Sequence, residues 1–455
     1  MNVFCNNRWS GSASVLVLAT LGVLAAPRIA RADDPDAIFG GGANDEFAVH
    51  GQATLVDQYH PRFRSPYVGP QSLNPGERGD ETTDVTAFLG ARLWKGAEFW
   101  IDPEFDQGFG LSNTLGIDAF TNAEGAKVGK SSPYPQIHRV IVRQTIDLGG
   151  ETQKVDADMN QFAGTQTANR IVITVGKMSV GDVFDTNKYA HDPKNDFLNW
   201  AIVDTGSFDY AADAWGYTYG AAAEWYQGPW TLRAGVFDLS GVPNNKNLDK
   251  TFHQYQLDVE LERRYTLFGR EGAVRITGFD TRGRMGRYED AVLLAEETGD
   301  PANTALVRHY HSRLGLSFNL EQALTDDIGL FARAGHADGQ YEGYEYTDIS
   351  NTGAVGVSIK GSAWGRKDDV VGFAGLIDAA SSAEEAYLAA GGTGILDGDG
   401  ILPHPGPEKI IETYYSLPIL KFTHLSLDYQ YVDNPAFNRD RGPVSVFAFR
   451  LHTQL

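Results

Sequence analysis

The sequence predicts an all-β fold: a transmembrane β-barrel of the outer-membrane type, with about sixteen antiparallel strands and long loops on one side that fold into the lumen. Three observations lead to this prediction. Apolar and polar residues alternate through most of the chain, which is typical of strands with one apolar face. The polar faces carry full charges, and the chain ends inside an alternating segment.

The alternation is clearest at residues 254–262, where Tyr255, Leu257, Val259 and Leu261 share one face and polar residues share the other. Similar segments recur along the chain, and most are close to the roughly 9–11 residues that a tilted membrane strand needs. The sixteen candidate strands are 47–58, 84–93, 97–106, 136–148, 170–177, 215–226, 230–239, 254–262, 272–282, 309–320, 327–336, 352–362, 369–378, 408–418, 424–431 and 444–455.

A soluble β-sandwich is the competing architecture, because its strands alternate in the same way but turn their apolar face inward. In a membrane barrel the apolar face meets lipid and the polar face lines a wet lumen. Full charges on the polar faces favour the barrel. The residues concerned are Arg139, Arg143, Asp258, Glu260 and Arg313.

Two further features favour a membrane barrel. Aromatic residues gather at strand ends, as expected at a membrane–water interface; they are Trp215, Tyr217, Trp225 and Trp230. Segment 444–455 places Phe447, Phe449 and Leu451 on one face and resembles the closing strand of outer-membrane barrels, although Leu455 replaces the usual terminal aromatic residue.

Residues 1–32 are predicted to form a cleaved export signal. They contain no acid and three arginines, and an apolar run at 13–26 precedes Ala30-Arg31-Ala32, which has the form of a signal-peptidase site. This run is too short to span a membrane as a helix. We therefore expect a lead-in at 33–46, a single barrel at 47–455, and a location in the outer membrane of a Gram-negative bacterium.

Charge and cysteine content exclude several classes of protein. Removing residues 1–32 changes the net charge from −21 to 35 − 59 = −24, because this segment holds three of the 38 basic residues and none of the 59 acids. Such a chain is a poor partner for nucleic acid. The only cysteine, Cys5, lies in the signal, so no disulfide or thiol chemistry is expected in the remainder.

Long connections rich in Gly, Pro, Asn and Asp separate some of the candidate strands. Connections of this length are usually functional, and we expect them on the outer side of the barrel, where they can narrow the pore. Short helices are expected at 288–298 and 382–390. The long connections are 59–83, 107–135, 149–169, 178–214 and 379–407.

No catalytic residue, metal site or cofactor is predicted. The sequence has no G-x-S-x-G elbow, no H-E-x-x-H helix and no phosphate-binding loop. The segment Asp397-Gly398-Asp399-Gly400, with Glu408 further on, resembles a calcium-binding loop. Ile401 and Leu402, however, occupy positions that need an oxygen ligand and a glycine.

Carboxylates and arginines are expected to face one another across the lumen. The carboxylates are Glu98, Asp102, Glu104 and Asp106, and the arginines are Arg92, Arg139 and Arg143. A catalytic carboxylate pair is the alternative, but a transverse field across a pore is the simpler interpretation. Arginine offers forked donors to hydroxyls and anions, and Trp100 offers an apolar face to a sugar ring. This mixture suits a neutral, hydroxylated solute.

The hairpin around Trp94-Lys95-Gly96 supports this arrangement. A three-residue turn with Gly96 in the left-handed position keeps the strand faces in phase and sets Arg92 opposite Glu98.

Six segments resemble the carbohydrate-selective porin family of Gram-negative outer membranes. The most specific are V-G-K-M-S-V-G-D-V-F-D-T-N-K-Y-A-H-D-P-K-N-D-F-L-N-W-A from residue 175 and D-Y-A-A-D-A-W-G-Y-T-Y-G-A-A from residue 209. The others are G-Q-A-T-L-V-D-Q-Y-H-P-R-F-R-S-P-Y, G-A-R-L-W-K-G-A-E-F-W-I-D-P-E, L-P-H-P-G-P-E and N-R-D-R-G-P-V-S-V-F-A-F-R-L-H, which start at residues 51, 90, 402 and 438.

The resemblance implies a barrel of about sixteen strands, diffusion of glucose and similar sugars, and a constriction built by inward loops and lumen arginines. By position, Arg92, Glu98 and Trp100 fall in the family's hairpin. Four further residues fall in the family's loop block. For each of them, packing that holds the loop in shape is the alternative to contact with a sugar. These loop residues are Asp185, Asn187, Lys188 and Asn195.

We therefore expect passive, weakly selective passage of small neutral sugars. The expected partners are outer-membrane lipid, lipopolysaccharide and the barrel-assembly machinery, with either a monomer or a trimer as the functional unit. A general or anion-preferring diffusion porin is the first alternative. An outer-membrane or secreted enzyme acting on polysaccharide and a soluble sugar-binding sandwich are the others.

Overall fold

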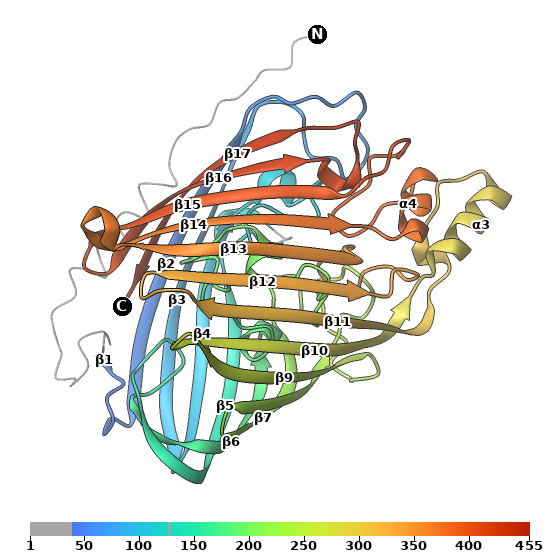
Figure 1. Cartoon of the computed structure of the whole chain (residues 1–455). Helices are drawn as coiled ribbons and strands as arrows, with labels where there is room; N and C mark the ends of the chain where they lie inside the picture. The colour runs from blue at the N-terminus through green and yellow to red at the C-terminus, as the bar shows by residue number, and fades with distance from the viewer. Residues whose placement is uncertain (1–38, 126–128) are drawn as a thin grey trace.

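The computed structural model describes residues 39–125 and 129–455 and shows a closed antiparallel barrel (Figure 1). Strands β2 to β17 each pair with their neighbours in sequence, and β17 pairs with β2 to close the barrel. The sixteen strands are β2 (Phe47–His60), β3 (Arg78–Trp94), β4 (Ala97–Gly108), β5 (Lys130–Val155), β6 (Gly164–Met178), β7 (Thr218–Gln227), β8 (Trp230–Asp238), β9 (Tyr255–Leu267), β10 (Arg270–Met285), β11 (His309–Ala323), β12 (Ile328–Ala337), β13 (Asn351–Gly361), β14 (Arg366–Ala379), β15 (Glu408–Leu420), β16 (Thr423–Asp433) and β17 (Val444–Gln454).

The predicted number of strands is confirmed, and each candidate segment overlaps one of them. Within the predicted lead-in, the short strand β1 (Phe39–Gly40) pairs with the start of β2. The predicted export signal, 1–32, lies outside the described residues. None of the helices in the described part of the chain is long and apolar enough to cross a membrane.

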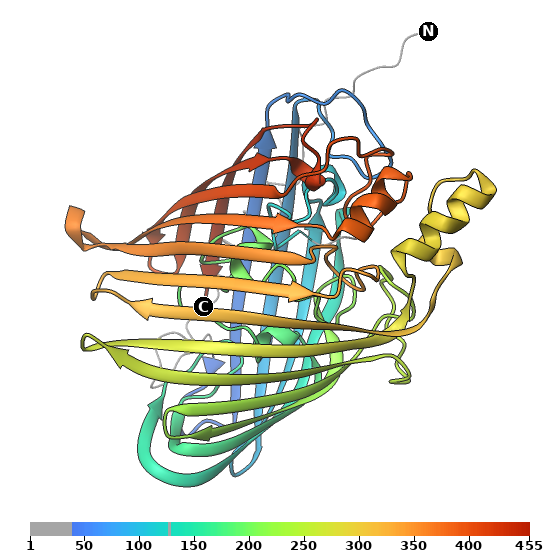
Figure 2. The same ribbon diagram turned by 45° about the vertical axis from the view of Figure 1, so that its right-hand side comes forward.

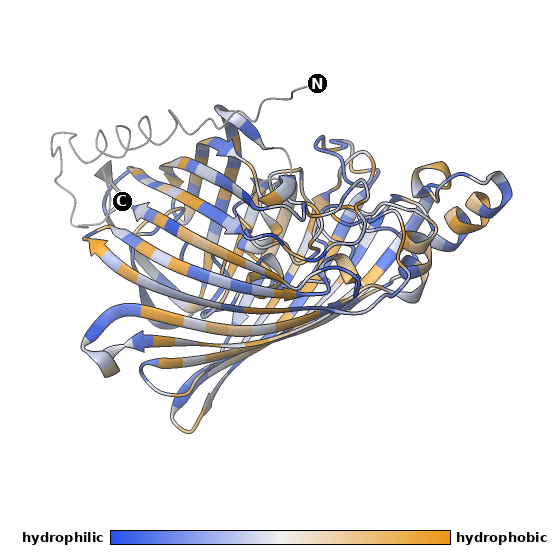
Figure 3. Cartoon of the chain, turned by 90° about the horizontal axis from the view of Figure 1, so that it is seen from above, coloured by the Kyte–Doolittle hydropathy of each residue, from blue (hydrophilic) through white to orange (hydrophobic). Residues whose placement is uncertain are grey.

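The strands turn their apolar faces outward, which distinguishes this barrel from a soluble sandwich. In β9, Leu257, Val259 and Leu261 are 42%, 51% and 44% exposed, whereas Asp258 and Glu260 between them are fully buried. Figure 3 shows apolar and polar positions alternating along the strands. Such an exterior is stable only against lipid, so the competing soluble architecture is wrong.

The two ends of the barrel differ (Figures 1 and 2). Short turns join strands at the end where the chain terminates, and long connections with helices α3 (Tyr288–Thr298) and α4 (Ser382–Ala389) lie at the other end. Both helices are where the sequence predicts them. The other helices among the described residues are α2 (Trp200–Val203) and the single turns η1 (Leu111–Asn113), η2 (Val180–Asp182), η3 (Thr304–Leu306), η4 (Ser362–Trp364) and η5 (Pro435–Phe437).

Two predicted connections differ from the structure. Most of 149–169 is a strand hairpin, because β5 and β6 extend toward residues 156–163, which lie at the short-turn end. The other is the turn after β3. Trp94 pairs with Ala97, which leaves a two-residue turn with Gly96 at φ +76°, and a register shift precedes it. The predicted pairing of Arg92 with Glu98 is confirmed.

The connection between β6 and β7, residues 179–217, folds into the barrel and is called the inner loop below. Many of its apolar side chains are buried, including Phe197, Ile202 and Phe208. Polar side chains of the wall bind its backbone. Glu412 accepts hydrogen bonds from the N–H groups of Leu198 and Asn199 at 2.5 and 3.0 Å. The inner loop is therefore a fixed part of the lumen.

This loop changes the role of several charged residues. We expected Asp258, Glu260 and Arg313 to face water, but they are at most 1% exposed, so that expectation is wrong. Glu260 accepts a hydrogen bond from the N–H of Asp185 at 2.9 Å, and Arg313 lies 3.4 Å from the Asp209 carboxylate. Buried backbone groups need hydrogen-bond partners. Charged side chains of the barrel wall, such as Glu260, supply some of these partners to the inner loop.

Candidate functional site

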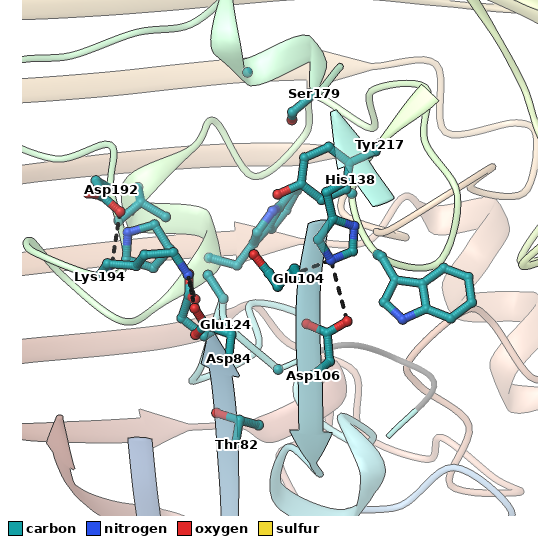
Figure 4. Close-up of a pocket in the computed structure, with 18 of the residues that line it drawn as sticks. Thr82, Asp84, Glu104, Asp106, Glu124, His138, Ser179, Asp192, Lys194 and Tyr217 are labelled. Atoms are coloured by element: carbon teal, nitrogen blue, oxygen red, sulfur yellow. Dashed lines mark hydrogen bonds and ion pairs between the residues drawn. The ribbon is translucent and has the colours of Figure 1, made fainter. Parts of the chain in front are cut away.

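A cavity of about 390 Å³ lies inside the barrel between strands β3 to β5 and the inner loop (Figure 4). Its volume falls in the range of about 300–1,000 Å³ that is typical of small-molecule sites. Two permanent cations, Arg139 and Lys194, and two histidines, His138 and His191, line it. Seven carboxylates also line it: Asp84, Glu104, Asp106, Glu124, Asp182, Asp192 and Asp204.

Lys194 of the inner loop is held by carboxylates from two other segments. Its Nζ lies 3.2 Å from Asp84 on β3 and forms an ion pair with Glu124 of the 109–129 connection (Figure 4). Burial works against the charged amine, but these carboxylates raise its pKa well above the usual value. The ammonium group therefore joins three parts of the chain at the cavity wall.

His138 on β5 contacts two carboxylates that lie two residues apart on β4 (Figure 4). Its Nε2 is 3.1 Å from Glu104 Oε1 and 3.4 Å from Asp106 Oδ2. The Tyr217 ring stacks on the imidazole with centroids 4.3 Å apart. These three titratable side chains can hold a metal ion in principle, because their ligand atoms lie within 4.8 Å of one another. The contacts of His138 with Glu104 and Asp106 explain why the three side chains lie together without a metal ion.

Arg139 forms the third ion pair of the cavity. It donates to both carboxylate oxygens of Asp182 at 2.8 and 2.6 Å, and it lies 3.6 Å from Asp102. Burial opposes the charged carboxylate, but the guanidinium group holds the pKa of Asp182 below its usual value. Arg139 also lies over the Tyr217 ring, 5.0 Å from its centroid.

A break in strand register brings His138 and Arg139 to the same cavity. Successive side chains of a regular strand point to opposite faces, yet both of these neighbours line the space. The pairing of β4 with β5 shifts between Asp102 and Pro103, where Asp102 pairs with Arg139 and Pro103 pairs with Ile137. Such a bulge redirects a side chain. Regular alternation, on which the strand prediction depends, does not reveal it.

Aromatic rings form another part of the wall. Phe120 stacks on Trp200 with centroids 5.4 Å apart, and Tyr346 stacks on the same indole at 6.0 Å. Trp215 and Tyr217 also line the cavity, so their predicted place at the membrane interface is wrong. Trp225 and Trp230, by contrast, are 49% and 45% exposed on the outer surface of the barrel, as a place at the membrane interface requires.

A second cavity of about 240 Å³ lies toward the short-turn end, where the final residue Leu455 is among its lining residues. Met159 lines both cavities. On the other side, Lys194 lines the first cavity and Asn195 the second. Both cavities are therefore bounded by the 156–163 connection and the inner loop.

Of the predicted β-strand residues, Arg139 lines the 390 Å³ cavity. The others do not line it; they are Arg92, Glu98, Trp100, Asp102 and Arg143. Arg92 donates to the carbonyl of Ala163 at 2.7 Å, and Arg143 donates to that of Asn160 at 2.7 Å. Asn160 also donates to Asp102 at 2.9 Å, and Trp100 donates to Glu98 at 3.1 Å. This group fastens the 156–163 connection inside the barrel, and direct contact with a solute stays a prediction.

The predicted residues of the inner loop have separate surroundings. Asp185 and Asn187 both bind Asn319 of the wall, each at 2.7 Å. The Lys188 side chain is exposed, and its N–H donates to Glu321 at 2.8 Å. Asn195 is exposed in the second cavity. The packing interpretation therefore describes Asp185 and Asn187 well.

Sequence reasoning missed most of the residues that line the cavity. Asp84 is a charged residue at the start of the predicted strand 84–93. Its place on the polar face of that strand could have identified it as a lumen residue. Asp182, Lys194 and Trp200 lie within the recognised loop motif but were not singled out there. Tyr346 comes from a distant connection, and no local pattern indicates it.

A closed barrel with an apolar exterior and a charged interior cavity defines a channel of the outer-membrane porin class. Residues 71–455 match the model of the carbohydrate-selective porin, OprB family, and the chain belongs to this family. A search of curated proteins gave no significant match.

Of three similar solved structures, the first supports the fold. The high-pH structure of Pseudomonas putida OprB has a TM-score of 0.68 at 15% sequence identity, over 90% of this chain and 94% of that chain. The low-pH structure of the same protein gives 0.48 at 12% identity, over 90% and 93% of the two chains. The channel DcaP of Acinetobacter baumannii gives 0.49 at 8% identity, over 90% and 97%.

Proposed function

We propose that this porin lets small neutral sugars such as glucose diffuse across the outer membrane through a weakly binding cavity. The observation that carries the proposal is the combination of aromatic ring faces with ion-paired polar groups in one space. Ring faces suit the C–H surfaces of a sugar, and the polar groups offer hydrogen-bond donors and acceptors to its hydroxyls. Membership of the family does not specify which sugar passes, so glucose is part of the proposal.

The existing ion pairs favour weak binding. Lys194, His138 and Arg139 each contact carboxylates already, so a solute has to share or displace those contacts. A dissociation constant near 1 mM corresponds to about −4 kcal/mol. With an association rate of about 10⁶ M⁻¹s⁻¹, the solute leaves in roughly a millisecond. A micromolar site would hold it about a thousand times longer and slow the flux.

Charge weighs against the anion-preferring alternative. Seven acidic side chains line this cavity beside two permanent cations, so at neutral pH the cavity carries an excess of negative charge. An excess of negative charge lowers the local concentration of anions. Neutral solutes are not affected in this way.

Tyr217 gives the sharpest test of the sugar site. Tyr217 lines the cavity and holds His138 and Arg139 in place there through its ring, so Tyr217→Ala removes part of the lining and frees both polar side chains. It is expected to weaken sugar block of the ion current by about two- to tenfold. The measurement is a titration of glucose, maltose and sucrose on single channels in planar bilayers. Tyr219→Ala is the matched control, since Tyr219 is 40% exposed on the outer surface. Wild-type current that no sugar changes would contradict the proposal.

Asp204 is expected to make ion selectivity depend on pH. Burial raises the pKa of Asp204 to about 6, and this carboxyl lines the cavity. As the pH rises through this value, the group loses its proton and adds a negative charge. The cation-to-anion permeability ratio, measured from reversal potentials in a salt gradient, should therefore rise between about pH 5 and 7. The rise should be smaller in Asp204→Asn; an equal rise would exclude Asp204 as its source.

We also propose a cleaved export signal, assembly by the barrel-assembly machinery, and contact with lipid and lipopolysaccharide. The apolar exterior supports the contact with lipid. The channel fold and the family support a function without catalysis.

A further inference from the structure

We propose that a calcium ion binds between Asp118, Asp348 and Asp397, where it joins three long connections at the outer end of the barrel. Asp118 belongs to the connection between β4 and β5, Asp348 to that between β12 and β13, and Asp397 to that between β14 and β15. This site is separate from the sugar cavity, since none of the three residues lines it.

The geometry fits one ion. Each carboxylate offers an oxygen, and these oxygens all lie within 4.8 Å of one another. Calcium–oxygen distances are about 2.3–2.6 Å, so two ligands of one ion lie at most about 5 Å apart. The three side chains are at most 1% exposed. The site is therefore an enclosed cluster rather than a group of solvated surface acids.

Unsatisfied oxygen atoms are the second observation. Both carboxylate oxygens of Asp118 and both of Asp397 are buried without a hydrogen-bond partner, as is Oε1 of nearby Glu384. Buried polar groups normally have partners, and a bare carboxylate in such a place is costly. Glu408 provides a contrast, because three backbone N–H groups satisfy its carboxylate.

The cluster also lacks compensating charge. Burial, followed by repulsion from neighbouring carboxylates, raises the pKa of Asp118 and of Asp397 well above the usual value. Arg313 acts favourably on Asp348, but its guanidinium lies 3.4 Å from Asp209 and is already paired there. A divalent cation supplies the missing positive charge and the missing partners together.

The backbone is arranged to bring the carboxylates together. The N–H of Gly116 donates to the carbonyl of Leu396 at 2.7 Å, which aligns the segments that carry Asp118 and Asp397. A methyl group on Gly394 would meet Asp397 Oδ1 at 2.2 Å and Asp348 Oδ2 at 2.5 Å. Glycine at this position therefore leaves room for the two carboxylates.

The chemistry of the ligands selects calcium. The oxygen-only set disfavours zinc and copper, which prefer nitrogen or sulfur ligands. Magnesium usually keeps several bound waters and needs a regular octahedron, which does not suit a buried cluster built from three separate connections. A continuous calcium loop at Asp397 is not expected, because Ile401 and Leu402 occupy positions that need an oxygen ligand and a glycine. The ligands come instead from positions far apart in the chain, which no local spacing reveals.

Terbium luminescence tests the site directly on the full-length mature porin in detergent. Tb³⁺ replaces Ca²⁺ at oxygen sites, and the Tyr288 hydroxyl lies 3.4 Å from Asp348 Oδ1, close enough to sensitise the ion. We expect a saturable signal that excess Ca²⁺ displaces. Asp118→Asn and Asp397→Asn should weaken Tb³⁺ binding by about tenfold or more. The exposed Asp300→Asn is the control and should bind like wild type.

A wild-type signal that Ca²⁺ does not displace, or equal affinity in all variants, would overturn the proposal. Thermal unfolding provides a second readout that does not depend on luminescence. The wild-type midpoint should be higher in calcium than in EDTA, because an ion that binds only the folded state stabilises it. Asp397→Asn should lose this difference and exceed wild type in EDTA, since it removes repulsion. Equal wild-type midpoints in calcium and EDTA would also overturn the proposal.

Discussion

Arg333→Met is expected to lower the free energy of unfolding by about 3–5 kcal/mol, because it leaves the partners of a buried charge unpaired. Arg333 is 2% exposed on β12. Its guanidinium donates to the carbonyls of Ile202 and Asp185 at 2.8 and 3.1 Å, and lies 3.4 Å from the Asp185 carboxylate. The inner loop should also loosen, which raises the open-channel conductance. Denaturant unfolding in micelles and single-channel recording measure the two effects.

Arg270→Met is the matched control for this prediction. Arg270 also pairs with an aspartate, Asp326, but the two side chains are 39% and 84% exposed at the short-turn end. Exposed pairs of this kind contribute about 0–1 kcal/mol. Equal losses of stability in the two variants would show that burial of the Arg333 pair is not what holds the inner loop.

Trp100→Ala is expected to destabilise the barrel by about 3–5 kcal/mol, the usual effect of removing a buried large aromatic side chain. Trp100 is fully buried, and its ring lies 5.1 Å from that of Phe162 in the 156–163 connection. A methyl group on Gly90 would meet the indole at 2.5 Å, so the ring packs directly on the strand backbone. Unfolding followed by circular dichroism measures the change.

Trp364→Ala is the control, because Trp364 is 42% exposed. Its loss should cost less than about 1 kcal/mol. The Trp100 variant should also change conductance, since Met159 and Asn160 of the same connection line the cavity. A stable Trp100 variant with weaker sugar block would instead assign this indole to solute binding.

The outline of the fold follows from the sequence because lipid imposes a simple rule. Leu257, Val259 and Leu261 alternate with polar residues because one face of the strand contacts lipid and the other faces the lumen. The same requirement applies to the other strands of the barrel. The two short helices also carry local signals. Gly96 marks its turn because a left-handed backbone favours glycine.

The arrangement inside the lumen is less predictable. Alternation identifies Arg139 and Arg313 as inward-facing, but it does not show that Arg139 lines a cavity while Arg313 is buried by the inner loop. Three-dimensional packing of connections decides this difference. Irregular strand register is a second reason that the lining residues are hard to predict, because the bulge beside Asp102 brings His138 into the cavity. Family motifs locate the inner loop, but not which of its side chains meet the open space.

Comparing glucose with gluconate in proteoliposomes tests the central claim most directly. The two solutes have the same carbon chain length, but gluconate is an anion, so their relative rates separate a path for neutral sugars from an anion channel. We predict rapid glucose entry, measured by isosmotic swelling, and slower gluconate entry because carboxylates outnumber cations in the cavity. Gluconate entry that equals or exceeds glucose entry, or vesicles that admit neither solute, would contradict the account.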